Sequence, residues 1–156
     1  MLKKLNVPPG QHGIRKRKKV SERGTQLREK QKLRYMFGIS ETQLKNYFKK
    51  ASLKKGNTAS YLSHSLESRL DNIIFHLGFA PTRAAARQLV THGHITINKK
   101  KLSIPSYQVR VGEEISFFNE KTTKIPYIES SLNVKDIILP AWLEKKATVG
   151  KLIAEP

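Results

Sequence analysis

The residues best suited to chemistry are cations that have no acidic neighbour at helical spacing. Arg83 and Arg87 are four residues apart, so on a helix they project from one side. Neither has an acidic residue three or four positions away, and three lysines, Lys99 to Lys101, follow. Unpaired cations on a rigid face bind phosphate oxygens well. We therefore expect a phosphate-binding face, with a merely solvated helix face as the alternative, because charge runs are usually solvated.

No side chains with catalytic or metal-binding spacing accompany these cations. Glu113 and Glu114 are adjacent, so on a strand they point to opposite faces and cannot form a carboxylate pair. The five histidines lack the spacing of a helical metal site, and the chain has no cysteine. It also lacks a nucleophile elbow, a Walker-type loop and a dinucleotide-binding glycine pattern. We expect no catalytic residue, no metal, no other cofactor and no small-molecule substrate.

Two helices are expected to position the arginines. Apolar residues recur at helical spacing from Leu66 to Leu77, and Gly78 follows where a left-handed cap residue would end the helix. Thr82 can cap a second helix, whose apolar face contains Ala86, Leu89 and Val90. Gly93 stands where that helix should end. The arginines would then lie opposite its packed face.

A small antiparallel sheet is expected after the second helix. From His94 onward the apolar residues alternate, which predicts strands near Ile95, over 107–111 and near Ile115. Asn98-Lys99 and Gly112-Glu113 are turn signals between them. Residues 119–128 lose the alternation, and Pro126, Pro140 and the polar run 129–133 indicate connecting structure with a short helix. Trp142 is expected to pack against the core, because no basic or aromatic stripe accompanies it.

The charge of the chain favours a polyanionic partner. The 156 residues contain 30 basic and 12 acidic side chains, a net charge of +18, and the pI is about 10.3. Residues 1–56 contain 17 of the basic and 3 of the acidic residues. No apolar run is long enough to span a membrane, and the basic run 15–19 lacks the broad apolar face of a membrane-surface helix. Nucleic acid is therefore the preferred partner, and we expect a soluble protein without an export signal.

The N-terminal third is predicted to be helical after an irregular start. Residues 11–23 show no apolar periodicity, so we expect an arm that orders only on RNA. A helix is expected from Thr25 to Phe37, and Gly38 ends it. Ser40 and Gln43 have capping-box spacing, and the following helix should bury Leu44, Tyr47, Phe48 and Ala51.

Five segments resemble a known family. The runs 67–72, 86–95 and 104–107 are similar to the RNA-binding module of the small-subunit ribosomal protein S-four family. The runs 8–13 and 27–34 resemble segments that this ribosomal family carries ahead of the module. The resemblance implies an α+β chain with a basic arm (1–24), a basic all-helical unit (25–64), an RNA-binding module of two helices and a small antiparallel sheet (65–120), and a connecting and C-terminal return segment (121–156).

The same resemblance implies a non-enzymatic function. Family members bind small-subunit ribosomal RNA directly and help to nucleate assembly, close to the path by which messenger RNA enters. The implied partners are this RNA, neighbouring small-subunit proteins and messenger RNA near its entrance, without a membrane. The implied location is a cytoplasmic ribosome, or one in the matrix or stroma of an organelle.

Two alternatives remain at this point. The module also occurs in RNA-modifying and tRNA-charging enzymes, so the chain could be a fragment of one. Too few residues flank the module for a catalytic core, however. A DNA-binding protein would need a helix rich in base-reading side chains, which the alanines beside Arg83 and Arg87 do not provide.

Three departures from the family pattern affect the expectations. The usual N-terminal extension, which has a four-cysteine zinc site in some members, is missing, so we expect no zinc. Lys99 replaces the glycine of the family's Asn-Gly turn, which predicts a looser turn. The chain ends at Pro156, before the family's return strand, so we expect shortened termini.

The residues expected to contact RNA combine the basic positions with polar residues of the module. They are Arg15, Lys16, Arg17, Lys18, Lys19, Arg23, Arg28, Lys32, Arg34, Lys45, Lys49, Lys50, Arg69, Arg83, Arg87, Gln88, His92, His94, Lys99, Lys100, Lys101, Tyr107 and Arg110.

Overall fold

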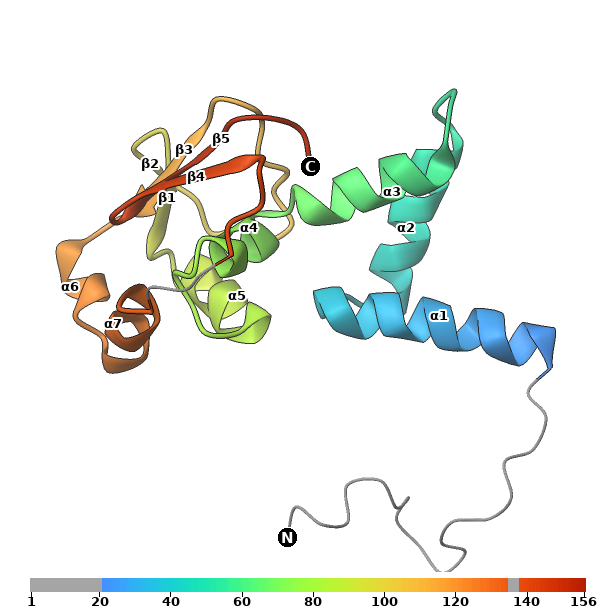
Figure 1. Cartoon of the computed structure of the whole chain (residues 1–156), viewed down its shortest axis with the longest axis horizontal. Coiled ribbons are helices and arrows are strands. Elements are labelled where there is room, and N and C mark those ends of the chain that lie inside the picture. Colours follow the sequence, from blue (N-terminus) through green and yellow to red (C-terminus); the bar gives the residue numbers. More distant parts are fainter. Residues whose placement is uncertain (1–20, 135–137) are drawn as a thin grey trace, which may run out of the picture. The chain divides into compact units, whose positions relative to one another are not determined.

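The computed structural model describes residues 21–134 and 138–156, and it divides the chain into two units, residues 1–33 and residues 34–156. Most of the expected basic arm, including Arg15 to Lys19, lies outside the described residues. In the described residues, five helices precede the first strand of an antiparallel sheet, and two more lie between its third and fourth strands (Figure 1), so the predicted α+β class is confirmed.

The described part of the first unit is the polar start of helix α1 (Glu22–Phe37). Ser21 precedes the helix, and its Oγ accepts a hydrogen bond from the Gly24 amide at 3.2 Å. This cap starts the helix three residues before the expected Thr25. The side chains of residues 21–30 are nearly all exposed, so this stretch of α1 has no apolar core of its own.

The second unit begins with the end of α1 and a pair of helices. Gly38 adopts φ +60° and ends α1, as predicted. The capping box at the start of α2 (Glu41–Ser52) is confirmed, because Ser40 and Gln43 each accept a hydrogen bond at 3.2 Å from the backbone of the other. Helix α2 packs against α3 (Thr58–Glu67). Phe48, expected to be buried, is 56% exposed, because Leu44 and Ala51 face the interior instead.

The first helix of the expected module is interrupted. Instead of continuing to Gly78, α3 ends at Glu67 and α4 (Leu70–His76) begins after an extended Arg69. The backbone around Arg69 bridges to Gln108, and the Leu70 amide donates to the Tyr107 carbonyl at 2.9 Å. The loop through residues 105–109 therefore bonds to the chain where the helix breaks. The apolar pattern does not reveal this break, because Leu66 before it and Leu70 after it are both fully buried.

Helices α4 and α5 (Arg83–Thr91) match the predicted ends. Gly78 and Gly93 adopt φ values of +66° and +70°, the left-handed conformation that glycine adopts at low cost. The Thr82 side chain caps α5 by accepting a hydrogen bond from the Ala85 amide at 3.1 Å.

The sheet has the strand order β2-β1-β3-β5-β4. Its strands are β1 (Ile95–Ile97), β2 (Lys100–Lys101), β3 (Glu114–Phe117), β4 (Leu143–Lys146) and β5 (Val149–Leu152). The predicted strand over residues 107–111 is wrong, because this segment bonds to the break before α4 instead of pairing in the sheet. The C-terminal segment contributes two strands, and β5 pairs with β3 from Glu114 opposite Lys151 to Ser116 opposite Val149.

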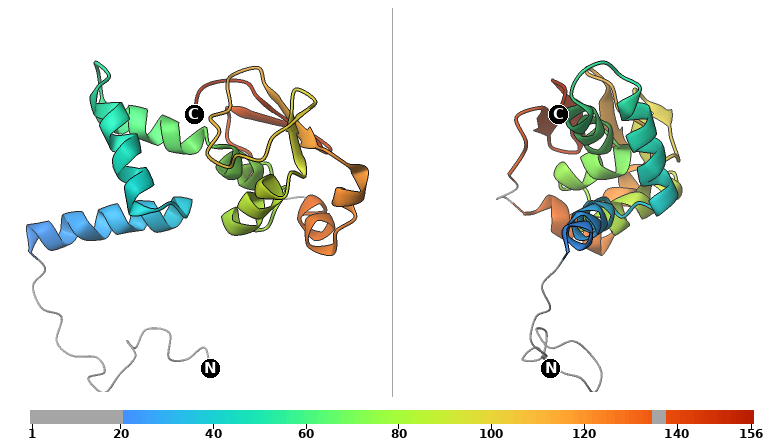
Figure 2. Two further views of the ribbon diagram at one scale, coloured as in Figure 1. Left: turned by 180° about the vertical axis from the view of Figure 1, so that it is seen from behind. Right: turned by 90° about the vertical axis from the view of Figure 1, so that its right-hand side faces the viewer.

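The hydrophobic core lies between the helices and one face of the sheet. Helices α4 and α5 lie on the same side of the sheet (Figures 1 and 2) and supply buried residues such as Ile74 and Leu89. The connecting segment forms α6 (Glu120–Thr123) and α7 (Pro126–Leu132), and Ile128 of α7 is fully buried. Trp142 is partly buried against this core, as expected.

Candidate RNA interface

Helix α5 presents its polar side outward because its other side is buried. Ala86, Leu89 and Val90 are at most 1% exposed, which fixes the rotation of the helix about its axis. Gln88 is exposed, and Arg83 and Arg87 are partly exposed. The sequence therefore predicted correctly which residues of α5 reach the surface.

The expectation that Arg83 and Arg87 have no partner is wrong. Two nitrogens of Arg87 donate to Asp71 Oδ2, at 2.8 and 3.2 Å, and a third donates to the Gly38 carbonyl at 2.6 Å. Arg83 Nε donates to Asn72 Oδ1 at 2.9 Å. These partners come from α4 and from the end of α1, whereas residue spacing tests only contacts within α5. About a third of the Arg87 side chain remains exposed.

The expectation that Arg69 lies on the RNA-binding surface is also wrong. It is 1% exposed, and its guanidinium donates to both oxygens of Asp71, at 2.6 and 3.0 Å. Its remaining terminal nitrogen donates to the Tyr47 hydroxyl at 2.9 Å. Burial by itself would lower the pKa of Arg69. The hydrogen bonds to Asp71 and the negative charge of Asp71 have the larger combined effect, so the pKa of Arg69 is raised. We call Tyr47, Arg69, Asp71 and Arg87 the Asp71 cluster.

A second polar chain lies next to the Asp71 cluster. The side-chain amide of Asn72 donates to Glu67 Oε2 at 2.6 Å, and Glu67 also lies 3.4 Å from His76 Nε2. The close approach of the His76 imidazole lowers the pKa of Glu67, although burial opposes this effect. Asn72 thus connects Glu67 to Arg83 and holds that arginine at the edge of the surface.

We predict that Glu67→Gln destabilises the protein near neutral pH but hardly at low pH. Because the folded-state pKa lies below the ordinary value of 4.5, the carboxylate stabilises the fold above that value. This contribution is lost as the pH falls through the folded-state pKa. Urea unfolding of both proteins at about pH 6 and about pH 3 measures it. An equal loss of stability at both pH values would show that the charge of the Glu67 carboxylate does not cause it.

The lysine turn is tight and lies against the end of α5. Asn98 and Lys99 have φ values of +49° and +66°, and Ile97 pairs directly with Lys100. The expected looser turn is therefore wrong. The backbone amide of Asn98 donates to the Glu114 carbonyl, and the backbone amide of Glu114 donates to the Asn98 side-chain oxygen. These two hydrogen bonds offset the cost of a left-handed lysine, which is about 1–2 kcal/mol.

Histidines and lysines meet beside this turn. A Cβ atom on Gly93 would overlap Lys101, so the lysine side chain crosses directly over the end of α5. The rings of His92 and His94 lie 6.1 Å apart. Lys99, Lys100, Lys101 and His92 are exposed, whereas His94 is partly buried beside Thr122. Gln88, His92 and the three lysines therefore form one exposed polar region, which we call the turn patch.

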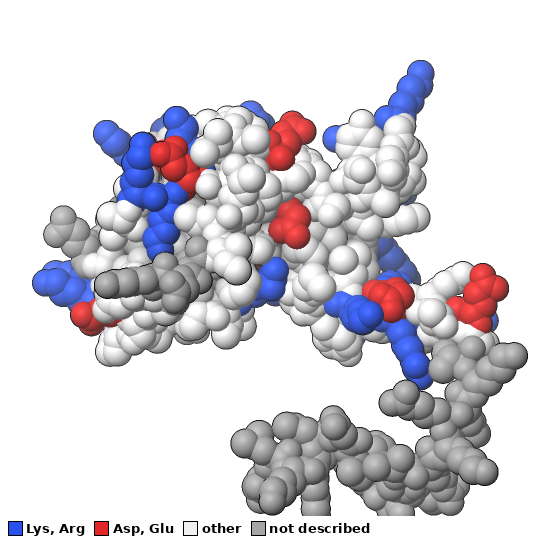
Figure 3. Space-filling model, viewed as in Figure 1, with Lys and Arg blue, Asp and Glu red and all other residues white. Residues whose placement is uncertain are grey.

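The other expected cations are distributed over the helices of both units. Lys45, Lys49 and Lys50 are exposed on α2, and Arg34 lies over the Tyr35 ring at 4.7 Å. In the first unit, Arg23, Arg28 and Lys32 are exposed on α1. Figure 3 shows basic side chains around the sheet, at the upper left, and at the loop between α2 and α3, at the upper right.

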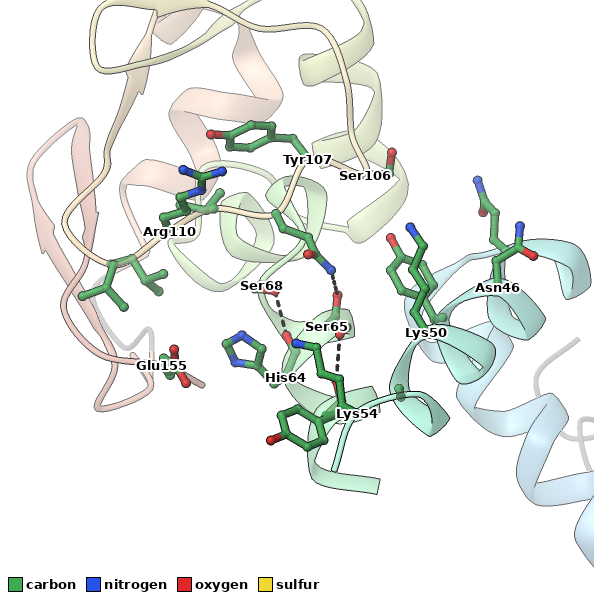
Figure 4. A pocket seen from close by; sticks show the side chains of 18 residues that line it. Asn46, Lys50, Lys54, His64, Ser65, Ser68, Ser106, Tyr107, Arg110 and Glu155 are labelled. Carbon is green, nitrogen blue, oxygen red and sulfur yellow. Dashed lines mark hydrogen bonds between the residues drawn. The ribbon is translucent and has the colours of Figure 1, made fainter. Parts of the chain in front are cut away.

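A groove of about 800 Å³ lies between α2, α3 and the loop through residues 106–111. Tyr107 and Arg110 line one side, and Lys50 lines the other (Figure 4). Tyr107 is held by a hydrogen bond from its hydroxyl to Glu113 at 2.8 Å, which raises its pKa. Lys54, Tyr61 and His64 also line this groove, and residue spacing did not indicate them, because the walls of the groove come from distant segments.

Comparison with known proteins identifies the family. Residues 1–67 match the ribosomal protein S4/S9 N-terminal domain, and residues 68–115 match the S4 domain. The whole chain is 49% identical to small ribosomal subunit protein uS4 of Bacteroides fragilis, over 78% of that protein's length. The uS4 proteins of Chlorobaculum tepidum and Aquifex aeolicus are 48% and 49% identical over 92% of this chain and 70% of their own length. The chain belongs to the uS4 family.

Membership of the uS4 family decides between the alternatives left open by the sequence. Proteins of this name are structural components of the small ribosomal subunit, so an enzyme fragment is not favoured. Among residues 21–134 and 138–156, no group of three histidine or acidic side chains could hold a metal ion. No helix in the same ranges is long and apolar enough to cross a membrane.

Proposed function

We propose that this chain is a structural constituent of the small ribosomal subunit that binds small-subunit ribosomal RNA directly and helps to nucleate assembly. The observation that carries the proposal is the turn patch, where three exposed lysines lie with His92 and Gln88 at the end of a capped helix. Such groups bind phosphate, and ribosomal RNA is the polyanion that the relatives' names supply.

The RNA contacts that we propose lie on both units. In the second unit they comprise the turn patch, the exposed side of α2, Arg34, Tyr107, Arg110 and the exposed parts of His94, Arg83 and Arg87. Arg69 is omitted because it is buried. In the first unit they comprise Arg23, Arg28 and Lys32, and the arm from Arg15 to Lys19 belongs to the same proposal, although it lies outside the described residues.

The finer parts of the proposal concern location and neighbours. We infer that the chain contacts neighbouring small-subunit proteins and lies near the path by which messenger RNA enters. The ribosome would be cytoplasmic, or would lie in the matrix or stroma of an organelle.

Equilibrium binding to two purified RNAs tests the proposed function. The full chain should bind small-subunit ribosomal RNA at least tenfold more tightly than large-subunit ribosomal RNA. Its affinity should also fall steeply with salt, because each phosphate contact releases condensed counterions. Equal affinity for both RNAs would contradict a specific role in the small subunit.

We predict that alanine at all three of Lys99, Lys100 and Lys101 weakens binding to small-subunit ribosomal RNA by tenfold or more. The logarithmic salt dependence should become shallower by about 0.7–0.9 for each phosphate that is no longer neutralised. The matched control replaces Lys121, Lys124 and Lys151 by alanine, since these are equally exposed lysines outside the proposed interface. If both triple variants weaken binding equally, total charge and not the turn patch determines affinity.

A further inference from the structure

The groove between α2 and the module loop has a charged wall on each side. Lys50 and Asn46 stand on the α2 side, and Arg110 stands on the opposite side with Tyr107 (Figure 4). Lys54 follows α2, and its ammonium lies over the Tyr61 ring at 5.0 Å, beside His64 of α3 (Figure 4). Among the described residues that line the groove, Glu155 is the single carboxylate, so the groove is cationic.

Aromatic rings accompany these cations, and hydrogen bonds already hold them in place. The groove is lined by Tyr47, Tyr61 and Tyr107. The Tyr47 hydroxyl accepts from Arg69, the Tyr61 hydroxyl donates to the Lys55 carbonyl at 3.2 Å, and the Tyr107 hydroxyl donates to Glu113. Rings fixed in this way lose little conformational entropy when a flat ligand stacks on them.

The size and the chemistry of the groove favour an unpaired nucleic-acid strand. A volume of about 800 Å³ is that of a small-molecule pocket, which suits one or two nucleotides and is too small for a duplex. Cations interleaved with aromatic rings are typical of single-strand binding. An acidic peptide would need the cations but not the rings, and it would usually pair with a strand edge.

We propose that this groove holds an unpaired segment of the ribosomal RNA, with its phosphates against Lys50, Lys54 and Arg110 and a base against the tyrosines. The proposal rests on the proposed function, and it assigns to RNA three residues, Lys54, Tyr61 and His64, that residue spacing did not select. The side-chain amide of Asn46 also lines the groove, where it can bond to the edge of the base.

Charge reversal tests the phosphate contacts. The groove variant carries Lys54→Glu and Arg110→Glu, and the control carries Lys121→Glu and Lys124→Glu, with the same change in net charge at exposed positions. For small-subunit ribosomal RNA we expect at least tenfold weaker binding by the groove variant and less than threefold by the control. The salt dependence of the groove variant should become shallower by about 0.7 for each single-strand phosphate that is no longer neutralised.

Cross-linking of the unaltered full chain provides a test that does not depend on any variant folding. Small-subunit ribosomal RNA transcribed with 4-thiouridine is irradiated in the complex, and cross-linked peptides are identified by mass spectrometry. We expect cross-links in the peptides that contain Tyr61 or Tyr107. Cross-links confined to the turn patch, with equal affinities of the two charge-reversal variants, would overturn the groove assignment while the proposed function stands.

The remaining outcomes are also decisive. Failure of the unaltered chain to prefer small-subunit ribosomal RNA would refute the proposed function, and the groove assignment with it. Binding of poly-glutamate that only the groove variant loses, together with unchanged RNA affinity, would overturn the assignment in favour of an acidic peptide.

Discussion

Replacing Asp71 by alanine should lower the free energy of unfolding by about 3–5 kcal/mol, because it leaves a buried arginine without its counter-ion. Asp71 is 3% exposed and binds the guanidinium groups of Arg69 and Arg87. The change also removes the carboxylate that accepts a hydrogen bond from the backbone amide of Asn72. Since small domains are stable by only about 5–15 kcal/mol, this loss should be visible as a large decrease in the urea midpoint.

The control for this prediction is Glu114→Ala, which removes an exposed carboxylate from β3. It should change the free energy of unfolding by less than about 0.5 kcal/mol. Changing Arg69 to Met in the Asp71→Ala protein should restore part of the loss, because the unpaired buried charge is then gone. A decrease for Asp71→Ala no larger than that for Glu114→Ala would show that the cluster does not stabilise the fold.

Ending the chain after residue 120 should abolish cooperative unfolding. The removed segment contains Ile128, Leu143 and Leu152, which are at most 5% exposed, and its strand β5 pairs with β3. Truncation of each such side chain costs about 2–5 kcal/mol, so the sum approaches the whole stability of a domain. The module that was predicted to end at residue 120 therefore depends on the C-terminal hairpin for its core.

A shorter truncation, after Ile153, provides the matched control. It removes only residues 154–156 and keeps the hydrogen bond from the Ile153 amide to the Trp142 carbonyl. Calorimetry should show a sharp transition for this control and a broad or absent transition for the 1–120 protein. A sharp transition of the 1–120 protein within a few degrees of the full chain would show that the hairpin is dispensable.

The sequence predicted the features that depend on local backbone conformation. Gly38, Gly78 and Gly93 end helices in the left-handed conformation, and Thr82 caps α5. Such signals involve residues at most a few positions apart, so one segment contains all the necessary information. The class of the fold and the outward side of α5 followed from the same local patterns.

The contacts that the sequence did not predict are made between distant segments. Asp71 and Arg87 are 16 positions apart, and Tyr47 and Arg69 are 22 apart. An arginine with no acidic neighbour in its own helix therefore gave no sign of the carboxylate that it binds. The groove was missed for the same reason, because α2 and the loop through residues 106–111 meet only in the folded chain.

The left-handed Lys99 illustrates how tertiary contacts override local preference. Lysine is unfavourable at this backbone conformation, which predicted a looser turn. The pairing of β1 with β2 and β3 holds the turn on both sides, so the strain of one residue is offset by ladder hydrogen bonds. Local backbone propensity alone therefore could not predict the tight turn.

Lysine footprinting tests the proposed RNA interface, because it locates the RNA on the chain. The full chain is acetylated alone and in complex with small-subunit ribosomal RNA, and the modified lysines are quantified by mass spectrometry. We expect that Lys45, Lys49, Lys99, Lys100 and Lys101 lose reactivity in the complex, whereas Lys121 and Lys124 keep it. Protection of Lys121 and Lys124 with undiminished reactivity of the turn lysines would contradict the proposed interface.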